Sequence, residues 1–203
     1  GSVQETDAKD GTATLKNKLY DPYVKFFRWA TDRLGGRDGI VCMVTNNSFV
    51  DQIAFDGMRK HLLQDFTRVY HLDMGGDMRK KGGGNVFGIR VGVGITVAIR
   101  SKQHQESQLF YHALPNAWTA SQKLAHLAEH VELQGRHNAL NTVQWSQLTP
   151  NTRHTWLVPQ DEQIFEQGIP MGTKEGKRQL IKDNGLLFKL YSLGVSTNRD
   201  AIV

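Results

Sequence analysis

The chain has 203 residues, of which 39% are hydrophobic and 22% charged. This composition suits a packed core and argues against a disordered or collagen-like chain, and the length suits one domain or one domain with part of a second. Lys and Arg exceed Asp and Glu by 25 to 20, and the net charge of +5 favours an anionic partner. The single cysteine excludes an internal disulfide framework. With no signal peptide and no apolar run that could cross a bilayer, we expect a cytoplasmic protein without a membrane part.

The first predicted element is a helix that follows a polar, flexible lead-in over residues 1–18. Asp21 and Pro22 are typical of a helix N-cap and first turn, and Gly35 marks its end. An apolar face recurs at steps of three and four residues, through Leu19, Tyr23, Phe26, Phe27, Ala30 and Leu34.

A strand and a second helix are predicted next. Residues 39–45 form a continuous apolar run, which is typical of a strand buried on both faces of a parallel sheet. Cys42 lies in this run, so we expect an inert, buried thiol. Residues 55–66 return to helical spacing and place Arg59 on the polar face, together with Lys60 and Gln64.

Two further strands, over residues 67–74 and 86–99, are predicted to form an antiparallel pair joined by a loop rich in Gly and Lys. Residues 19–99 therefore alternate as helix, strand, helix, strand, strand, which predicts half of an α/β sandwich whose sheet ends in an antiparallel hairpin.

The remainder of the chain, residues 103–203, is predicted to be mixed and rich in loops. We expect strands at 108–114 and 142–145, a helix at 119–131, and loops over 149–185. Apolar segments at 186–193 and 201–203 follow.

Positive charge is concentrated between residues 75 and 102, where six Lys and Arg residues accompany one Asp. Arg79, Lys80 and Lys81 lie on the glycine-rich loop, and such a loop can follow a phosphate backbone. The alternative is a solvated hairpin tip with lysines that protect a sheet edge. The pattern alone leaves both open.

Two asparagines, Asn46 and Asn47, directly follow the strand predicted at 39–45, and ligands of open α/β sheets bind beyond the carboxyl ends of strands. They could contact a substrate or only shape the turn before the next helix. The eight histidines are dispersed, and His126 and His130, four residues apart, lack a third ligand, so we expect no metal site.

Three blocks together resemble the methyltransferase region of type ISP restriction–modification enzymes, and a fourth resembles the segment where the target-recognition region of these enzymes begins. The first three span residues 19–34, 39–51 with 54–62, and 85–93, and the fourth spans 190–201. The first three include Leu-Tyr-Asp-Pro-Tyr-Val-Lys-Phe-Phe, Val-Thr-Asn-Asn-Ser-Phe and Asn-Val-Phe-Gly-Ile-Arg-Val-Gly-Val. The resemblance implies a partial Rossmann-like methyltransferase sheet over 19–102. It also implies that 103–203 is a connecting segment that leads into the target-recognition region.

In that family the loop for S-adenosylmethionine and the catalytic Asn-Pro-Pro-Tyr motif precede the first block, and neither occurs in this sequence. The resemblance thus implies part of an adenine-N6 DNA methyltransferase that is inactive by itself. Its partners would be double-stranded DNA and the other parts of one polypeptide, namely a nuclease, a helicase-like motor and the cofactor-binding half.

Roles for individual residues follow from the same resemblance. The target adenine has to leave the duplex, and Phe87 occupies the place where related enzymes stack an aromatic ring on the flipped base. Asn46 and Asn47 would contact the substrate, and Arg79, Lys80 and Lys81 would hold backbone phosphates. The alternative function is a non-catalytic nucleic-acid-binding domain with a degenerate methyltransferase fold.

Overall fold

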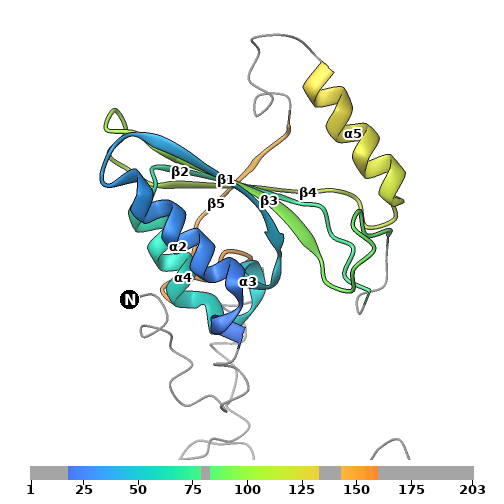
Figure 1. Ribbon diagram of the computed structural model, residues 1–203, viewed down its shortest axis with the longest axis horizontal. Coiled ribbons are helices and arrows are strands. Elements are labelled where there is room, and N and C mark those ends of the chain that lie inside the picture. The colour runs from blue at the N-terminus through green and yellow to red at the C-terminus, as the bar shows by residue number, and fades with distance from the viewer. Residues whose placement is uncertain (1–17, 79–82, 133–142, 160–203) are drawn as a thin grey trace, which may run out of the picture. The chain divides into compact units, whose positions relative to one another are not determined.

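The computed structural model describes residues 18–78, 83–132 and 143–159, and these form an α/β unit around one five-stranded sheet (Figure 1). The strand order is β1-β3-β2-β4-β5, and the sheet is antiparallel except where β2 and β4 run parallel. The elements are η2 (Lys18–Tyr20), α2 (Pro22–Leu34), β1 (Gly39–Asn46), α3 (Ser48–Asp51), η3 (Ile53–Phe55), α4 (Asp56–Asp65), β2 (Arg68–Asp73), β3 (Val93–Arg100), β4 (Gln108–Ala113), α5 (Ala120–Glu132) and β5 (Ser146–Leu148). None of the helices described has the length and apolar character needed to span a membrane.

The predicted first helix is confirmed at both ends. The Asp21 carboxylate accepts a hydrogen bond from the Tyr23 amide at 3.3 Å, and Pro22 occupies the first helical position. Gly35 ends α2 in the left-handed conformation, with φ of 54°. The lead-in predicted over residues 1–18 lies outside the described residues except for its last position.

The strand at 39–46 is confirmed, but its predicted burial on both faces is wrong. β1 is an edge strand of the described sheet and pairs with β3 alone, in antiparallel orientation. Val41 is buried under the helices, whereas Ile40, Cys42 and Val44 point to the other face and are exposed. The predicted burial of Cys42 is therefore also wrong, because an apolar run does not reveal how many neighbours a strand has.

The second helix is preceded by two short turns, α3 and η3, which the sequence pattern did not predict. Arg59 was expected on the polar face and is instead 2% exposed. Its guanidinium donates to the backbone carbonyls of Phe49, Gln52 and His154 at 2.7–2.8 Å. The position was mispredicted because a buried Arg needs acceptors that only the folding of distant segments brings together.

The predicted antiparallel pair is confirmed as β2 and β3, and the α/β fold class with it. β3 begins at Val93 and not at residue 86, because residues 85–92 form a turn stabilised by the Asn85 side chain. β3 lies between β1 and β2 and pairs with both. This sheet is compatible with part of a methyltransferase-like fold.

Beyond residue 102, β4 and α5 lie within two residues of the predicted elements. The strand predicted at 142–145 is displaced to β5, Ser146–Leu148, and residues 149–159 contain no helix or strand. Both β4 and β5 belong to the same sheet as β1–β3. The predictions for residues 160–203 lie outside the described part of the chain.

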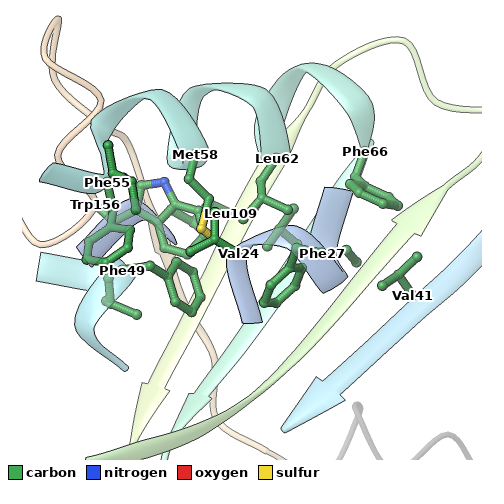
Figure 2. Close-up of a cluster of buried hydrophobic side chains, with 14 of the residues drawn as sticks. Val24, Phe27, Val41, Phe49, Phe55, Met58, Leu62, Phe66, Leu109 and Trp156 are labelled. Atoms are coloured by element: carbon green, nitrogen blue, oxygen red, sulfur yellow. The ribbon is translucent and has the colours of Figure 1, made fainter. Parts of the chain in front are cut away.

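The main hydrophobic core lies between the sheet and helices α2 and α4 (Figure 2). Phe49 and Trp156 meet edge to face at 5.6 Å there, so the segment after β5 closes the same core. A smaller cluster on the other face joins Leu72, Ile95 and Leu127 of α5. The two clusters fix the sheet and α5, and thereby the edge of the sheet at the carboxyl ends of β1, β2 and β4.

Candidate functional site

The candidate site is a cleft of about 530 Å³ at the carboxyl ends of β1, β2 and β4. These three strands run in the same direction, since β1 and β2 are both antiparallel to β3 and β4 is parallel to β2. The walls include three carboxylates, three asparagine amides and three glycines that bring backbone close to the opening: Asp51, Asp73, Asp77, Asn46, Asn47, Asn116, Gly75, Gly76 and Gly92. Such an edge is the usual ligand position in open α/β sheets.

The Asp73 carboxylate holds the centre of this edge together. Its Oδ1 accepts hydrogen bonds from the Asn47 amide and from the backbone N–H of Gly75, the latter at 2.7 Å. Its Oδ2 accepts from the hydroxyl of Tyr111 on β4 at 2.8 Å. Burial and the neighbouring Asp73 raise the pKa of Tyr111, so the phenol stays protonated and donating. One carboxylate thus joins β1, β2 and β4.

The two predicted asparagines occupy different positions on the cleft wall. The Asn46 Oδ1 accepts from the Ser48 amide at 2.7 Å, while its N–H₂ group has no partner among the described residues. The Asn47 N–H₂ group donates to Asp73 and to the Val93 carbonyl, and its Oδ1 is buried. Contact of Asn47 with a substrate stays a prediction, and it would require the amide to release one of these partners.

Beneath the cleft, His71 is completely buried and stacks on the Tyr111 ring at 6.0 Å. Its Nδ1 shares a hydrogen bond of 2.9 Å with the Thr96 hydroxyl. Burial lowers the pKa of His71 to about 4, against the opposing charge of Asp73, so the imidazole is neutral at pH 7. A Cβ atom at Gly94 would overlap Asn47 Oδ1 and come within 2.6 Å of the imidazole, so this position needs glycine.

Phe87 lies on the loop that borders the cleft, and its side chain is 59% exposed. The preceding Val86 packs into the smaller hydrophobic cluster, while residues 87–90 are all exposed. The Asn85 side chain connects this loop to Gly76, which is itself part of the cleft wall. The structure therefore places an exposed aromatic ring on a loop whose base is hydrogen-bonded to the cleft wall.

The predicted phosphate-binding residues Arg79, Lys80 and Lys81 lie outside the described residues, but the two ends of their loop are defined. At one end, the Gly75 N–H donates to the Asp73 carboxylate. At the other end, the Gly84 carbonyl accepts a hydrogen bond of 3.0 Å from the buried Lys123 ammonium of α5. Burial lowers the pKa of Lys123, and Asp73 opposes that shift. One end of the basic loop is thus fixed to the cleft and the other end to α5.

The positive charge of residues 75–102 does not form a single patch. β3 separates the cleft end at Val93 from Arg100 by seven residue steps, or about 24 Å. At the far end, Arg100 pairs with Asp65 and covers the Phe66 ring at 5.2 Å. The contacts of Arg100 therefore stabilise the fold at the end of the sheet opposite the cleft.

No three His, Cys, Asp or Glu side chains within 18–78, 83–132 and 143–159 form a group that could hold a metal ion. The His126 ring packs edge to face on Trp118 at 5.2 Å, and the side chain of His130 lies outside the described residues.

Four residues important for the cleft were not identified from the sequence: Asp73, Tyr111, Asn85 and Lys123. A detectable signal existed for Asp73, which lies at the penultimate position of the strand predicted over 67–74, before two glycines, and so nearly matches the rule applied to Asn46 and Asn47. Tyr111 and Lys123 become relevant only when β4 and α5 pack beside β2.

No protein-family model and no curated protein matches the chain. Several solved structures are similar to it. A cryoEM structure of a DrdV–DNA complex has a TM-score of 0.78 and 36% identity, and the match covers 98% of this chain and 20% of that chain. A nuclease-deletion mutant of the type ISP restriction–modification enzyme LlaGI, in complex with a DNA substrate mimic, has a TM-score of 0.76 and 26% identity over 98% of this chain and 18% of that chain.

The third is the ATP-dependent type ISP restriction–modification enzyme LlaBIII bound to DNA, with a TM-score of 0.71 and 31% identity over 88% of this chain and 12% of that chain. The chain thus spans a fifth or less of each of these polypeptides. The resemblance to type ISP restriction–modification enzymes is confirmed at this level: the chain is similar to one region of such DNA-associated enzymes.

Proposed function

We propose that this chain is part of an S-adenosylmethionine-dependent adenine-N6 DNA methyltransferase of a restriction–modification system, and that it supplies the base-stacking loop and DNA contacts. The observation that carries the proposal is the exposed Phe87 on a loop that is hydrogen-bonded to the wall of a polar cleft at the carboxyl edge of the sheet. An exposed aromatic ring contributes little to a core, and any DNA base can stack on it.

The chemistry of the cleft supports an extruded base as its ligand. Its three aspartates repel phosphate, so the backbone of the DNA would remain outside, near the basic loop. A base is uncharged and presents hydrogen-bonding edges that amides can satisfy. We assign Asn46 to such a contact with the base. Asn47 would hold the cleft wall in place through Asp73, or would contact the base after its hydrogen bond to Asp73 breaks.

The methyl donor would be held by another part of the polypeptide. Asp73 already accepts three hydrogen bonds, which leaves at most one acceptor position for the ribose hydroxyls of S-adenosylmethionine. The outer edge of β1 has no neighbouring strand among the described residues, and its Ile40 and Val44 side chains are 62% and 52% exposed. We propose that the cofactor-binding half extends the sheet at this edge.

The decisive experiment compares methyl transfer from labelled S-adenosylmethionine by the full-length parent polypeptide and by this chain. We expect transfer to adenine by the parent alone. In the parent, Phe87→Ala should reduce the methylation rate more than it reduces DNA affinity, because stacking is needed after the DNA is bound. If the parent binds DNA but transfers no methyl group, the alternative of a non-catalytic nucleic-acid-binding domain replaces the proposal.

The phosphate role of the basic loop is tested separately by the salt dependence of DNA binding. Neutralising Arg79, Lys80 and Lys81 together should weaken affinity and reduce the slope of log K against log salt by up to about 3. Lys25 and Lys60, on α2 and α4, give a matched control that should alter the slope little. An unchanged slope in the triple variant would assign the loop to the solvated hairpin tip instead.

A further inference from the structure

The side chain of Asn85 makes four hydrogen bonds, and all four close or anchor the loop that carries Phe87. Its Nδ2 donates to the carbonyls of Gly76 at 3.1 Å and Val91 at 2.7 Å. Its Oδ1 accepts from the backbone N–H groups of Phe87 at 2.9 Å and Ile89 at 3.3 Å. Both donors and the acceptor oxygen of the amide are therefore used within one loop.

The anchoring point is the cleft itself. A Cβ atom at Gly76 would lie 2.8 Å from the Asn85 Cα, and Gly76 has a φ of 82°, so the backbones approach as closely as a glycine permits. Gly76 lines the cleft, and the Asn85 amide bonds to its carbonyl. The base of the Phe87 loop is therefore fixed directly to the cleft wall.

The stabilised loop has an exposed tip. Val86 packs inward, Gly88 turns the chain with a φ of 66°, and Phe87 and Ile89 remain 59% and 44% exposed. Four side-chain hydrogen bonds thus fix a segment whose outer residues contribute little to the core. This arrangement is expected where the orientation of the exposed ring matters more than its burial.

We propose that Asn85 is a positioning residue that holds Phe87 in the orientation in which it stacks on an extruded base, an inference that rests on the stacking role proposed for Phe87. A ring on a loop fixed in advance loses little conformational entropy when a base stacks on it. Without Asn85, the loop has to be ordered by the DNA, so part of the stacking contribution to affinity is lost.

The test uses the full-length parent polypeptide and two DNA duplexes that differ at one position, an unpaired adenine in one and an abasic site in the other. The ratio of the two affinities isolates the contribution of the base. We expect Phe87→Ala and Asn85→Ala each to lower this ratio, by roughly tenfold for Phe87 and by a similar or smaller factor for Asn85. The double variant should lose no more than Phe87→Ala alone, because Asn85 acts through the ring.

The chain provides a closely matched control in Asn151. Its Oδ1 also accepts from backbone N–H groups two and four residues later, those of Arg153 and Thr155, both at 3.0 Å. Asn151→Ala should lower stability comparably and leave the affinity ratio unchanged. Amide hydrogen exchange provides a direct readout, since the N–H groups of Phe87 and Ile89 should exchange faster in Asn85→Ala. Should that variant fold poorly, Asn85→Asp keeps both acceptor contacts and loses both donors, and its ratio should fall between those of the wild type and Phe87→Ala.

The outcomes separate this inference from the proposed function. If Phe87→Ala lowers the ratio and the Asn85 variants do not, stacking stands and the positioning role fails. If losses from Asn85 and Phe87 add in the double variant, Asn85 acts independently of the ring and the positioning role also fails. If Phe87→Ala itself leaves the ratio unchanged, both the stacking role and the positioning role are overturned.

Discussion

The two ends of the sheet use charged and polar side chains in opposite ways. At the amino ends of β1 and β2, Arg28 and Arg100 both pair with Asp65, so opposite charges satisfy one another. At the carboxyl ends, Asp73 accepts hydrogen bonds only from uncharged donors, and an open cleft lies beside it. This difference shows that the positive charge of a sequence segment does not locate a binding site, because Arg100 belongs to the end of the sheet where charges already pair with one another.

The largest expected effect comes from Gly94→Ala at the cleft end. The new methyl group would overlap the Asn47 amide and the His71 ring, so we expect a loss of about 3 kcal/mol in the free energy of unfolding, the upper range for overpacking. Urea denaturation measures this loss in the free energy of unfolding. Gly88→Ala is the control: it meets no atom within 4 Å and costs only the left-handed backbone, about 1 kcal/mol. Equal losses in the two variants would contradict close packing beneath the cleft.

The second effect is a pH dependence that originates at the cleft end. Because burial lowers the folded-state pKa of His71 to about 4, the unfolded chain takes up the proton first as the pH falls below about 6.5. Stability is therefore complete above that pH and is lost progressively toward pH 4, by about 2 kcal/mol between pH 7 and pH 5. Titration of the His71 ring by NMR tests the cause directly. A midpoint near 6.5 would show that the ring is accessible to solvent.

The smallest effect compares one carboxylate from each end. Asp73→Asn places an N–H₂ group or an uncharged oxygen opposite three donors, and we expect a loss of about 1.5 kcal/mol. Asp32→Asn removes the exposed pair with Arg28 at the other end, and the denaturation midpoint should stay unchanged. Comparable shifts for the two variants would remove the distinction between the ends.

Much of the fold was predictable because its signals are local. The Asp21 cap, Pro22 and Gly35 define α2 through contacts within a few residues, and alternation marks β2 in the same way. Asn46 and Asn47 were placed correctly at a strand end by the same local logic. The predicted start of β3 was wrong because the Asn85 side chain forms hydrogen bonds with the backbone of residues 85–92 that compete with strand pairing.

The sequence by itself determined the order of the main helices and strands and the resemblance to type ISP restriction–modification enzymes. The tertiary structure decided that β1 is an edge strand with Cys42 exposed, that Arg59 is buried, and that Asp73, Asn47 and Tyr111 meet. These features depend on which strands become neighbours. That choice is made by burial and hydrogen bonding between segments 26 to 95 residues apart, which no local pattern encodes.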